Sequence, residues 1–229
     1  MPKRNPRNEE DLQRSRGNDA GSPALVIALS KGRVLEQLLP LLEGAGVDTQ
    51  VITAKDRRLI RHDAQTGISF LLLKPDDVPT YVEYGAADLG VVGRDVLFER
   101  DYDLYAPLDL GIGRCRLVVA GPDRNWADLA RMRTLRVATK FPKLTARHFA
   151  AKGMSVETIF VQSSAEIAPL TGLADVIVDL VESGETLRRH QLEELETVCE
   201  VSSVLVANRV GFKLKRNLIL PLIDRLSGA

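Results

Sequence analysis

Short apolar runs alternate with stretches of helical periodicity along most of this chain. Residues 24–29 (ALVIAL), 68–73 (ISFLLL) and 88–92 (DLGVV) have the length and composition of short strands, and helical patterns that end at glycine follow the first two. Strands that alternate with helices at this spacing predict an α/β fold with a largely parallel sheet.

Residues 104–120 interrupt this alternation, because they form a long extended stretch with internal glycines. Residues 198–206 (VCEVSSVLV) are again extended. We expect the two segments to be crossover strands that join two α/β lobes, with a ligand cleft between the lobes. The first lobe would comprise residues 24–113 together with 198–229, and the second lobe would comprise residues 114–197.

The charge balance excludes several classes of partner. The chain has 31 basic and 31 acidic residues, so no bulk field draws it to nucleic acid or to an anionic membrane, and any anion site must be local. No apolar segment reaches the roughly 18 residues that span a bilayer. Residues 1–23 are polar and charged, which predicts a disordered tail without a secretory signal, and therefore a cytoplasmic protein. Cys115 and Cys199 lack the spacing of a zinc site.

The stretch of residues 174–187 (ADVIVDLVESGETL) has the clearest chemical layout in the chain. A predicted strand leads into a turn of small and polar residues, and an amphipathic helical pattern begins near Leu187. Such a turn can bind a phosphate, because the backbone N–H groups at a helix N-terminus point at the ligand and the helix dipole is positive there. Ser183 and Thr186 offer hydroxyl donors, and Gly184 lets the backbone approach closely.

Two aspartates, Asp175 and Asp179, lie four residues apart in the same predicted strand and therefore on one face of it. Carboxylates there could bind ribose hydroxyls or a divalent ion. Asp179 also interrupts an apolar run, where a buried charge without a partner is costly. The alternative is an ordinary strand–turn–helix connection, since Glu182 and Glu185 would repel a phosphate unless their side chains turn away.

Basic residues suited to a polyanion occur in the first predicted lobe. Lys31 and Arg33 follow the first strand, where open α/β sheets bind ligands, and Arg57 belongs to a basic cluster at residues 55–61. In the second lobe, Glu166 follows two serines at a predicted helix start that faces the cleft. Solvated loop charges and an ordinary acidic first helical turn are the alternatives. The residues alone predict a cytosolic two-lobed α/β protein that binds a phosphorylated, polyanionic small molecule, and they name no reaction.

Several stretches taken together resemble the short form of ATP phosphoribosyltransferase, the first enzyme of histidine biosynthesis. They are ALSKGR (28–33), DVPTYVEYGAADLGVVGRD (77–95), LRVATKFP (135–142) and SSAEIAPLTGLADVIVDLVESGETL (163–187). The resemblance implies an α/β, two-lobed, periplasmic-binding-protein-like (type II) fold with two crossover strands and a central cleft. It implies a reaction that joins N1 of the ATP adenine to C1 of phosphoribosyl pyrophosphate (PRPP), releases pyrophosphate and requires Mg²⁺.

The resemblance also implies roles for individual residues. Residues 182–187 would form the loop that binds the 5-phosphate of PRPP. Arg33 and Arg57 would be catalytic, because fixed guanidinium groups stabilise the negative charge that grows on the departing pyrophosphate. No strong base is needed, since adenine N1 carries a lone pair, and Mg²⁺ would be held mainly by the substrate phosphates. The implied PRPP-binding residues are Lys31, Glu166, Asp175, Asp179, Ser183, Gly184, Glu185 and Thr186, and the implied ATP-binding residues are Arg33, Arg57 and Asp95.

The long form of this family continues into a C-terminal histidine-sensing domain, which we do not expect in a chain that stops at Ala229. The resemblance instead implies a separate histidine-sensing regulatory subunit similar to histidyl-tRNA synthetase, in a hetero-oligomer built on catalytic-subunit dimers. The alternative function, from a different class, is a small-molecule effector-binding or solute-binding module on the same fold. That function would call for a signal peptide or a DNA-binding helix pair, and the N-terminal residues show neither pattern.

Overall fold

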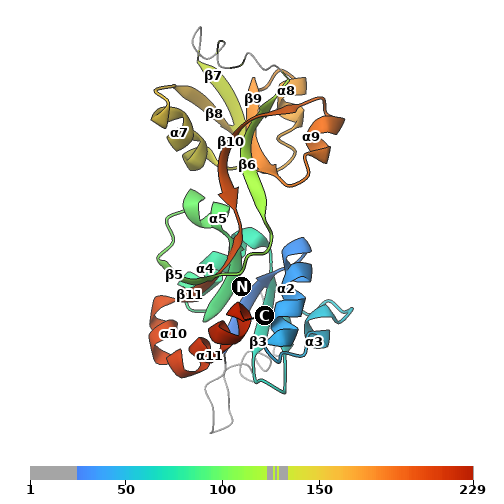
Figure 1. Cartoon of the computed structure of the whole chain (residues 1–229), viewed down its shortest axis with the longest axis vertical. Coiled ribbons are helices and arrows are strands. Elements are labelled where there is room, and N and C mark those ends of the chain that lie inside the picture. Colours follow the sequence, from blue (N-terminus) through green and yellow to red (C-terminus); the bar gives the residue numbers. More distant parts are fainter. Residues whose placement is uncertain (1–24, 123–125, 127, 129–133, 229) are drawn as a thin grey trace, which may run out of the picture. The chain divides into compact units, whose positions relative to one another are not determined.

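The structure is a computed structural model that describes residues 25–122, 126, 128 and 134–228 (Figure 1). The tail predicted for residues 1–23 lies outside the described residues, and so do most of residues 126–131, whose sequence predicts a helix. Within the described part of the chain, no helix is both long and apolar enough to cross a membrane.

The chain divides into two compact units. Unit 1 comprises the described residues up to Leu97, the segment Tyr102–Gly113 and the residues from Ser202 onward. Unit 2 comprises Phe98–Asp101 and the described residues of Arg114–Val201.

Unit 1 is built on a six-stranded mixed sheet. Its strands are β1 (Val26–Ser30), β2 (Ile60–His62), β3 (Ser69–Leu73), β4 (Leu89–Gly93), β5 (Leu104–Asp109) and β11 (Ser203–Asn208). They follow the order β2-β3-β1-β4-β11-β5. β1 pairs in parallel with β3 and β4, whereas β2, β11 and β5 run antiparallel to their neighbours.

Helices cover both faces of this sheet (Figure 1). They are α2 (Arg33–Gly44), α3 (Gln50–Thr53), the 3₁₀ helix η1 (Pro75–Asp77), α4 (Val78–Glu83), α5 (Arg94–Glu99), α10 (Arg209–Leu214) and α11 (Arg216–Ser227), and the last two residues of α5 belong to unit 2. α2 and α11 pack with strand residues such as Ile27 and Phe70, while α4 packs with their neighbours Ala28 and Leu71. Adjacent residues thus enter opposite clusters, which is the period-two pattern of strands buried on both faces.

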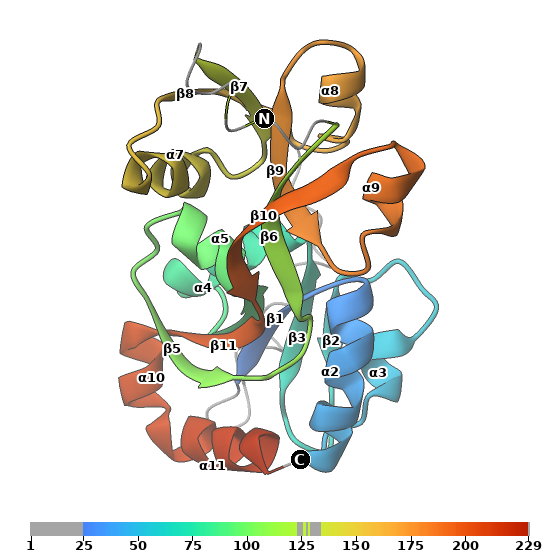
Figure 2. The same cartoon turned by 45° about the horizontal axis from the view of Figure 1, so that its top comes forward.

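Unit 2 is built on a five-stranded mixed sheet. Its strands are β6 (Cys115–Gly121), β7 (Leu135–Thr139), β8 (Val156–Phe160), β9 (Val176–Val181) and β10 (Glu193–Val201), in the order β10-β6-β9-β7-β8. β7 is parallel to β8 and β9, and β6 is antiparallel to β9 and β10. The helices are α7 (Pro142–Ala151), α8 (Ile167–Leu170) and α9 (Glu185–Arg189). Figure 2 shows α7 on one side of this sheet and α8 and α9 on the other, in agreement with two separate apolar clusters.

Several local expectations from the sequence are wrong. The sheets are mixed and not largely parallel. In unit 1, antiparallel strands lie on both sides of the parallel strands β3, β1 and β4, and in unit 2 the parallel strands β9, β7 and β8 form one side of the sheet while β6 pairs antiparallel with β9 and β10. The sequence of residues 47–53 indicates an extended segment, but these residues contain α3. The expected single strand at residues 198–206 is divided into β10 and β11 at Ser202. The sequence pattern of residues 213–226 predicts one last helix, whereas the structure has two helices there, α10 and α11.

Candidate active site

Three parallel strands end at one edge of the unit 2 sheet. Thr139, the last residue of β7, is in register with Phe160 of β8 and with Val178 of β9. The segments that follow the three strands at this edge are residues 140–141, 161–166 and 182–184. Ligands of open α/β sheets bind at the carboxyl ends of such strands, so this edge is the candidate site of unit 2.

Thr139 fixes the end of β7. Its side chain is buried, and its hydroxyl donates to the carbonyl of Val178 (2.7 Å) and accepts the N–H of Phe141 (2.9 Å). These bonds tie the turn after β7 to β9 and hold Lys140 at the edge. Sequence reasoning did not single out Thr139, although a threonine that bonds to the backbone two residues on is a recognised turn signal.

Asp179 and Glu166 form an acidic pair beside Lys140. Asp179 is partly buried, and its Oδ1 accepts the N–H of Leu180 (2.8 Å). Burial raises the pKa of Asp179 and the charge of Glu166 raises it further, while the Leu180 N–H and the Lys140 ammonium lower it. The cluster therefore combines carboxylates, which can accept hydrogen bonds from sugar hydroxyls, with a positive charge that can bind a phosphate.

The predicted phosphate turn follows β9. Gly184 caps α9 with a φ of 70°, a left-handed conformation that favours glycine, and the Ser183 hydroxyl accepts the N–H of Glu185 (3.4 Å). The Glu185 carboxylate pairs with Arg189 at 2.6 Å, so its charge is partly neutralised within α9. α9 has only five residues and begins before the predicted start near Leu187. A phosphate here would rely on N–H groups and hydroxyls more than on a helix dipole.

A second layer of charged residues supports this turn. Arg116 of β6 contacts both carboxylate oxygens of Glu194 of β10, at 2.9 and 3.1 Å. A Cβ placed on Gly184 would lie 3.0 Å from Glu194 Oε1 and 3.2 Å from Arg188 Nη1. The turn is therefore packed against an ion pair that bridges two strands. Sequence reasoning missed Arg116 and Glu194, because no local pattern connects residues that lie 78 positions apart in the chain. It also missed Arg188, which follows Gly184 by four residues within α9.

Asp175 occupies a different place from the one predicted. Its Oδ2 accepts the N–H of Arg136 (2.9 Å), and its Oδ1 lies 3.5 Å from the Arg136 guanidinium. Arg136 lies near the start of β7, so Asp175 caps the opposite end of the parallel strands from the turn. Four residues of strand separate Asp175 from Asp179 by about 13 Å. This geometry corrects the prediction that the two aspartates bind one ribose together, because Asp175 contacts Arg136 at the other end of the strands.

The predicted basic residues of unit 1 lie on two exposed turns. Lys31 and Gly32 follow β1, and Arg33 is the exposed first residue of α2. Gly32 has a φ of 102° with no atom within 4 Å of a Cβ placed on it, so the backbone of this turn is open. Arg57 is exposed in the segment between α3 and β2.

Asp95, a predicted ATP contact, is only 6% exposed. A Cβ on Gly93 would collide with its carboxylate, so the absence of a side chain at Gly93 creates the space that Asp95 fills. This aspartate is packed inside its unit and does not present its carboxylate on the surface.

Two further features limit where ligands could bind. In the described part of the chain, no group of three or more His, Cys, Asp or Glu side chains could enclose a metal ion. The N-terminus of α7 is occupied by the chain itself, since the Glu99 carboxylate accepts the N–H groups of Lys143 (2.9 Å) and Leu144 (3.0 Å).

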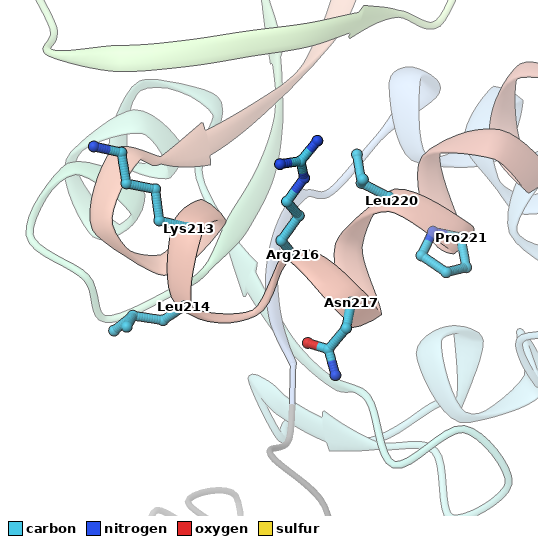
Figure 3. Close-up of a pocket in the computed structure, with 6 residues that line it drawn as sticks. All are labelled: Lys213, Leu214, Arg216, Asn217, Leu220 and Pro221. Atoms are coloured by element: carbon cyan, nitrogen blue, oxygen red, sulfur yellow. The ribbon is translucent and has the colours of Figure 1, made fainter.

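A hollow of about 660 Å³ lies at the junction of α10 and α11 (Figure 3). Its lining residues are Lys213, Leu214, Arg216, Asn217, Leu220 and Pro221. None of them belongs to the predicted site, so this hollow adds nothing to the candidate site.

The chain is similar to known proteins over most of its length. A family model described as HisG: ATP phosphoribosyltransferase matches residues 74–228. The ATP phosphoribosyltransferase of Sorangium cellulosum (strain So ce56) is 57% identical over 206 residues, which cover 90% of this chain and 95% of that protein. That of Citrifermentans bemidjiense is 43% identical over 204 residues, covering 88% of this chain and 96% of that protein.

Two solved structures are similar in fold. A chain of the ATP phosphoribosyl transferase (HisG:HisZ) complex from Thermotoga maritima has a TM-score of 0.73 and 33% identity, covering 89% of this chain and 96% of that chain. The alkanesulfonate-binding protein SsuA from Xanthomonas axonopodis pv. citri has a TM-score of 0.56 and 14% identity, covering 91% and 74%. At that identity the second likeness concerns the fold alone. It confirms the predicted periplasmic-binding-protein-like fold class.

Proposed function

The chain belongs to the ATP phosphoribosyltransferase family, and from this premise we propose how its residues perform the reaction. It is a glycosyltransferase, the catalytic subunit for the first step of histidine biosynthesis. The reaction joins C1 of PRPP to N1 of the ATP adenine and releases pyrophosphate. The observation that carries the assignment of residues is the convergence of Lys140, Glu166, Asp179 and the turn after β9 at one edge of a sheet.

The phosphoribosyl group of PRPP is proposed to bind at this edge. The N–H groups of residues 183–186 and the hydroxyls of Ser183 and Thr186 bind the 5-phosphate, with Gly184 allowing close approach. Asp179 and Glu166 accept hydrogen bonds from the ribose hydroxyls. The pairing of Glu185 with Arg189 supports this role, because it removes one of the two charges that would repel a phosphate.

The exposed arginines of unit 1 are proposed to act on the leaving group. Displacement at C1 passes through a transition state with oxocarbenium character, in which negative charge grows on the departing pyrophosphate. Guanidinium groups held in place before the reaction stabilise that charge, and each single donor of this kind contributes about 10²–10³ in kcat. Arg33 and Arg57 are assigned this role, with Lys31 as an additional positive charge. No general base is required, because adenine N1 attacks with its own lone pair.

Mg²⁺ is proposed as the divalent ion, held mainly by the phosphates of the substrates. This arrangement needs no dedicated protein cage, because Mg²⁺ usually keeps several waters and is bound through one or two carboxylates together with substrate phosphates. When bound, the ion supplies charge neutralisation at the phosphate oxygens.

The partner is proposed to be a HisZ-type regulatory subunit, since the similar Thermotoga maritima chain was solved in a HisG:HisZ complex. We propose a hetero-oligomer built on catalytic-subunit dimers. The proposed location is the cytoplasm, in keeping with biosynthetic relatives.

The test is to mix the chain with ATP, PRPP and Mg²⁺, with and without the regulatory subunit, and to follow the ultraviolet absorbance of the adenine ring. Substitution at N1 changes that spectrum, so turnover appears as an absorbance rise that depends on all three components. Absence of turnover in the complete mixture, together with tight binding of an unrelated small solute, would favour the solute-binding alternative and refute the proposal.

A further inference from the structure

Arg61 is a buried arginine beneath the turn that carries Arg57. Only 5% of its side chain is exposed, although it belongs to the short edge strand β2. Its Nη2 donates to the carbonyl of Ala54 (3.0 Å), lies 3.5 Å from the carbonyl of Asp56 and pairs with Asp56 Oδ1 at 2.8 Å. Its Nε is buried and has no hydrogen-bond partner in the described part of the chain. One guanidinium therefore holds two points of the segment between α3 and β2.

Asp56 joins this anchor to the turn. Its Oδ1 accepts the backbone N–H of Arg58 (2.8 Å), and its Oδ2 accepts the Arg58 Nε–H (2.9 Å). The Arg58 backbone N–H, then the Arg58 side chain, and also Arg61, lower the pKa of Asp56 to about 2. The carboxylate is consequently ionised near neutral pH, where it can accept both hydrogen bonds from Arg58 and pair with Arg61.

These contacts pair two of the three nearby arginines with Asp56 and leave the third exposed. Arg58 and Arg61 are both paired with Asp56, at 2.9 and 2.8 Å. Arg57 lies between Asp56 and Arg58, is exposed, and makes no hydrogen bond or ion pair with any of the described residues. Of these three arginines, Arg57 is thus the one available to an anionic ligand.

Stability alone does not account for Arg61. A buried ion pair is often no more stabilising than apolar side chains of the same volume, and a buried donor without a partner lowers stability. An apolar residue at position 61 would avoid both penalties, but it could not hold Ala54 and Asp56. The arrangement is explained if the position of the turn matters to function.

We propose that Arg61 and Asp56 are positioning residues of the transferase, which fix the turn of residues 56–58 and so hold the Arg57 guanidinium in one place within unit 1 before the reaction begins. This inference rests on the leaving-group role proposed for Arg57. Neither positioning residue touches the substrate. Misplacement of a catalytic group by about 1 Å can lower a rate by about 10²-fold, so loosening the turn has a large kinetic effect.

The experiment is a double-mutant cycle on kcat with the full chain and its regulatory subunit. Arg57→Ala is expected to lower kcat by about 10²-fold. Asp56→Ala is expected to lower it by about 10–100-fold, with the dissociation constant of PRPP little changed. The double variant should be as active as Arg57→Ala within about 3-fold, because a positioning residue has nothing left to position. If Asp56 acted independently of Arg57, the fold-losses in kcat of the two single variants would multiply in the double variant.

Asp48→Ala is the matched control. Asp48 is an exposed aspartate of the same unit that closes a similar turn, by accepting the N–H of Gln50 (3.0 Å), but it holds no arginine. Its replacement should leave kcat unchanged. Arg61→Met is a second variant, which keeps a long apolar side chain and loses the Nη2 contacts with Ala54 and Asp56. It should lower kcat, and Arg57→Ala should mask that loss in the same way.

The outcomes separate the two proposals. Losses that multiply in the double variant, or full activity in Asp56→Ala, overturn the positioning role while the transferase function stands. An unchanged kcat in Arg57→Ala overturns the role of Arg57 and the positioning proposal with it. A parent chain without activity, assayed with its partner, refutes the proposed function itself. Thermal unfolding of each variant shows that the measured rates belong to folded protein.

Discussion

Replacing Gly184 by alanine tests the proposed phosphate turn most directly. A Cβ at Gly184, where φ is 70°, would lie 3.0 Å from Glu194 Oε1 and 3.2 Å from Arg188 Nη1. The left-handed conformation costs a residue with a Cβ about 1–2 kcal/mol. Glu194 must also move against its pairing with Arg116, whose side chains are 36% and 34% exposed, and loosening such a pair costs at most about 1 kcal/mol. Gly184→Ala should therefore lower the free energy of unfolding by about 1–3 kcal/mol.

Gly153→Ala provides the matched control for backbone strain. Gly153 has a φ of 71°, lies after α7, and has no atom within 4 Å of a Cβ placed on it. Its replacement should lower the free energy of unfolding by about 1–2 kcal/mol and leave the dissociation constant of PRPP unchanged. Gly184→Ala should raise that constant about 10-fold, or about 1.4 kcal/mol, because the N–H groups of the turn shift away from the phosphate.

The assay is titration calorimetry of PRPP with Mg²⁺, combined with thermal unfolding of both variants. If the two variants lose similar stability and bind PRPP with the same dissociation constant, the 5-phosphate does not bind at this turn. The comparison also separates the effect of backbone strain from that of side-chain contacts. Both glycines have a left-handed backbone, but of the two, Gly184 alone has side chains close to the position of its Cβ.

Three further predictions concern charged residues. Arg33→Ala and Arg57→Ala should each lower kcat by about 10²-fold with little effect on PRPP binding, whereas Arg225→Ala, which removes an exposed charge from α11, should leave steady-state rates unchanged. Burial raises the pKa of Asp179, so its charged form lowers native stability above that pKa, and this penalty disappears as the pH falls toward the ordinary value of about 3.9. Asp179→Asn should therefore raise Tm at pH 7, lose that gain below about pH 4, and weaken PRPP binding; an unchanged or lower Tm at pH 7 would contradict the burial argument. Asp175→Ala should lower stability by about 1–3 kcal/mol, because a backbone N–H loses its acceptor, and should leave the PRPP dissociation constant within about 2-fold of the parent value.

The apolar runs of the sequence identify most of the strands, because buried strands need continuous apolar side chains. The runs at residues 24–29, 68–73 and 88–92 correspond to β1, β3 and β4. β2 was missed because Ile60–His62 contains a basic residue within a basic cluster, and the burial of Arg61 depends on Asp56 and on the carbonyl of Ala54. Local periodicity contains no information about such a tertiary contact.

The turn after β9 could be predicted from the sequence, since its strand, glycine and hydroxyl residues are consecutive. The pairing of Glu185 with Arg189 could also have been predicted, because residues four apart on a helix are neighbours on its surface. The contacts of Asp175 with Arg136 and of Gly184 with Glu194 could not be predicted, since strand order and register bring those residues together.

In each unit, an arginine–carboxylate ion pair supports the turn that is proposed to bind the ligand. In unit 2, the Arg116–Glu194 pair lies against Gly184, and in unit 1, the Arg61–Asp56 pair lies beneath Arg57. Each pair takes at least one member from a strand, so the sheet sets the position of the turn, and preorganised donors need no rearrangement when charge develops. The pairs differ in burial, since the Arg116 side chain is 36% exposed and that of Arg61 only 5%. Loss of the exposed pair should change ligand binding with little change in Tm, because surface pairs contribute at most about 1 kcal/mol. Arg61→Ala should lower kcat, and it should also lower Tm because it leaves a cavity under the turn and removes the partner of Asp56.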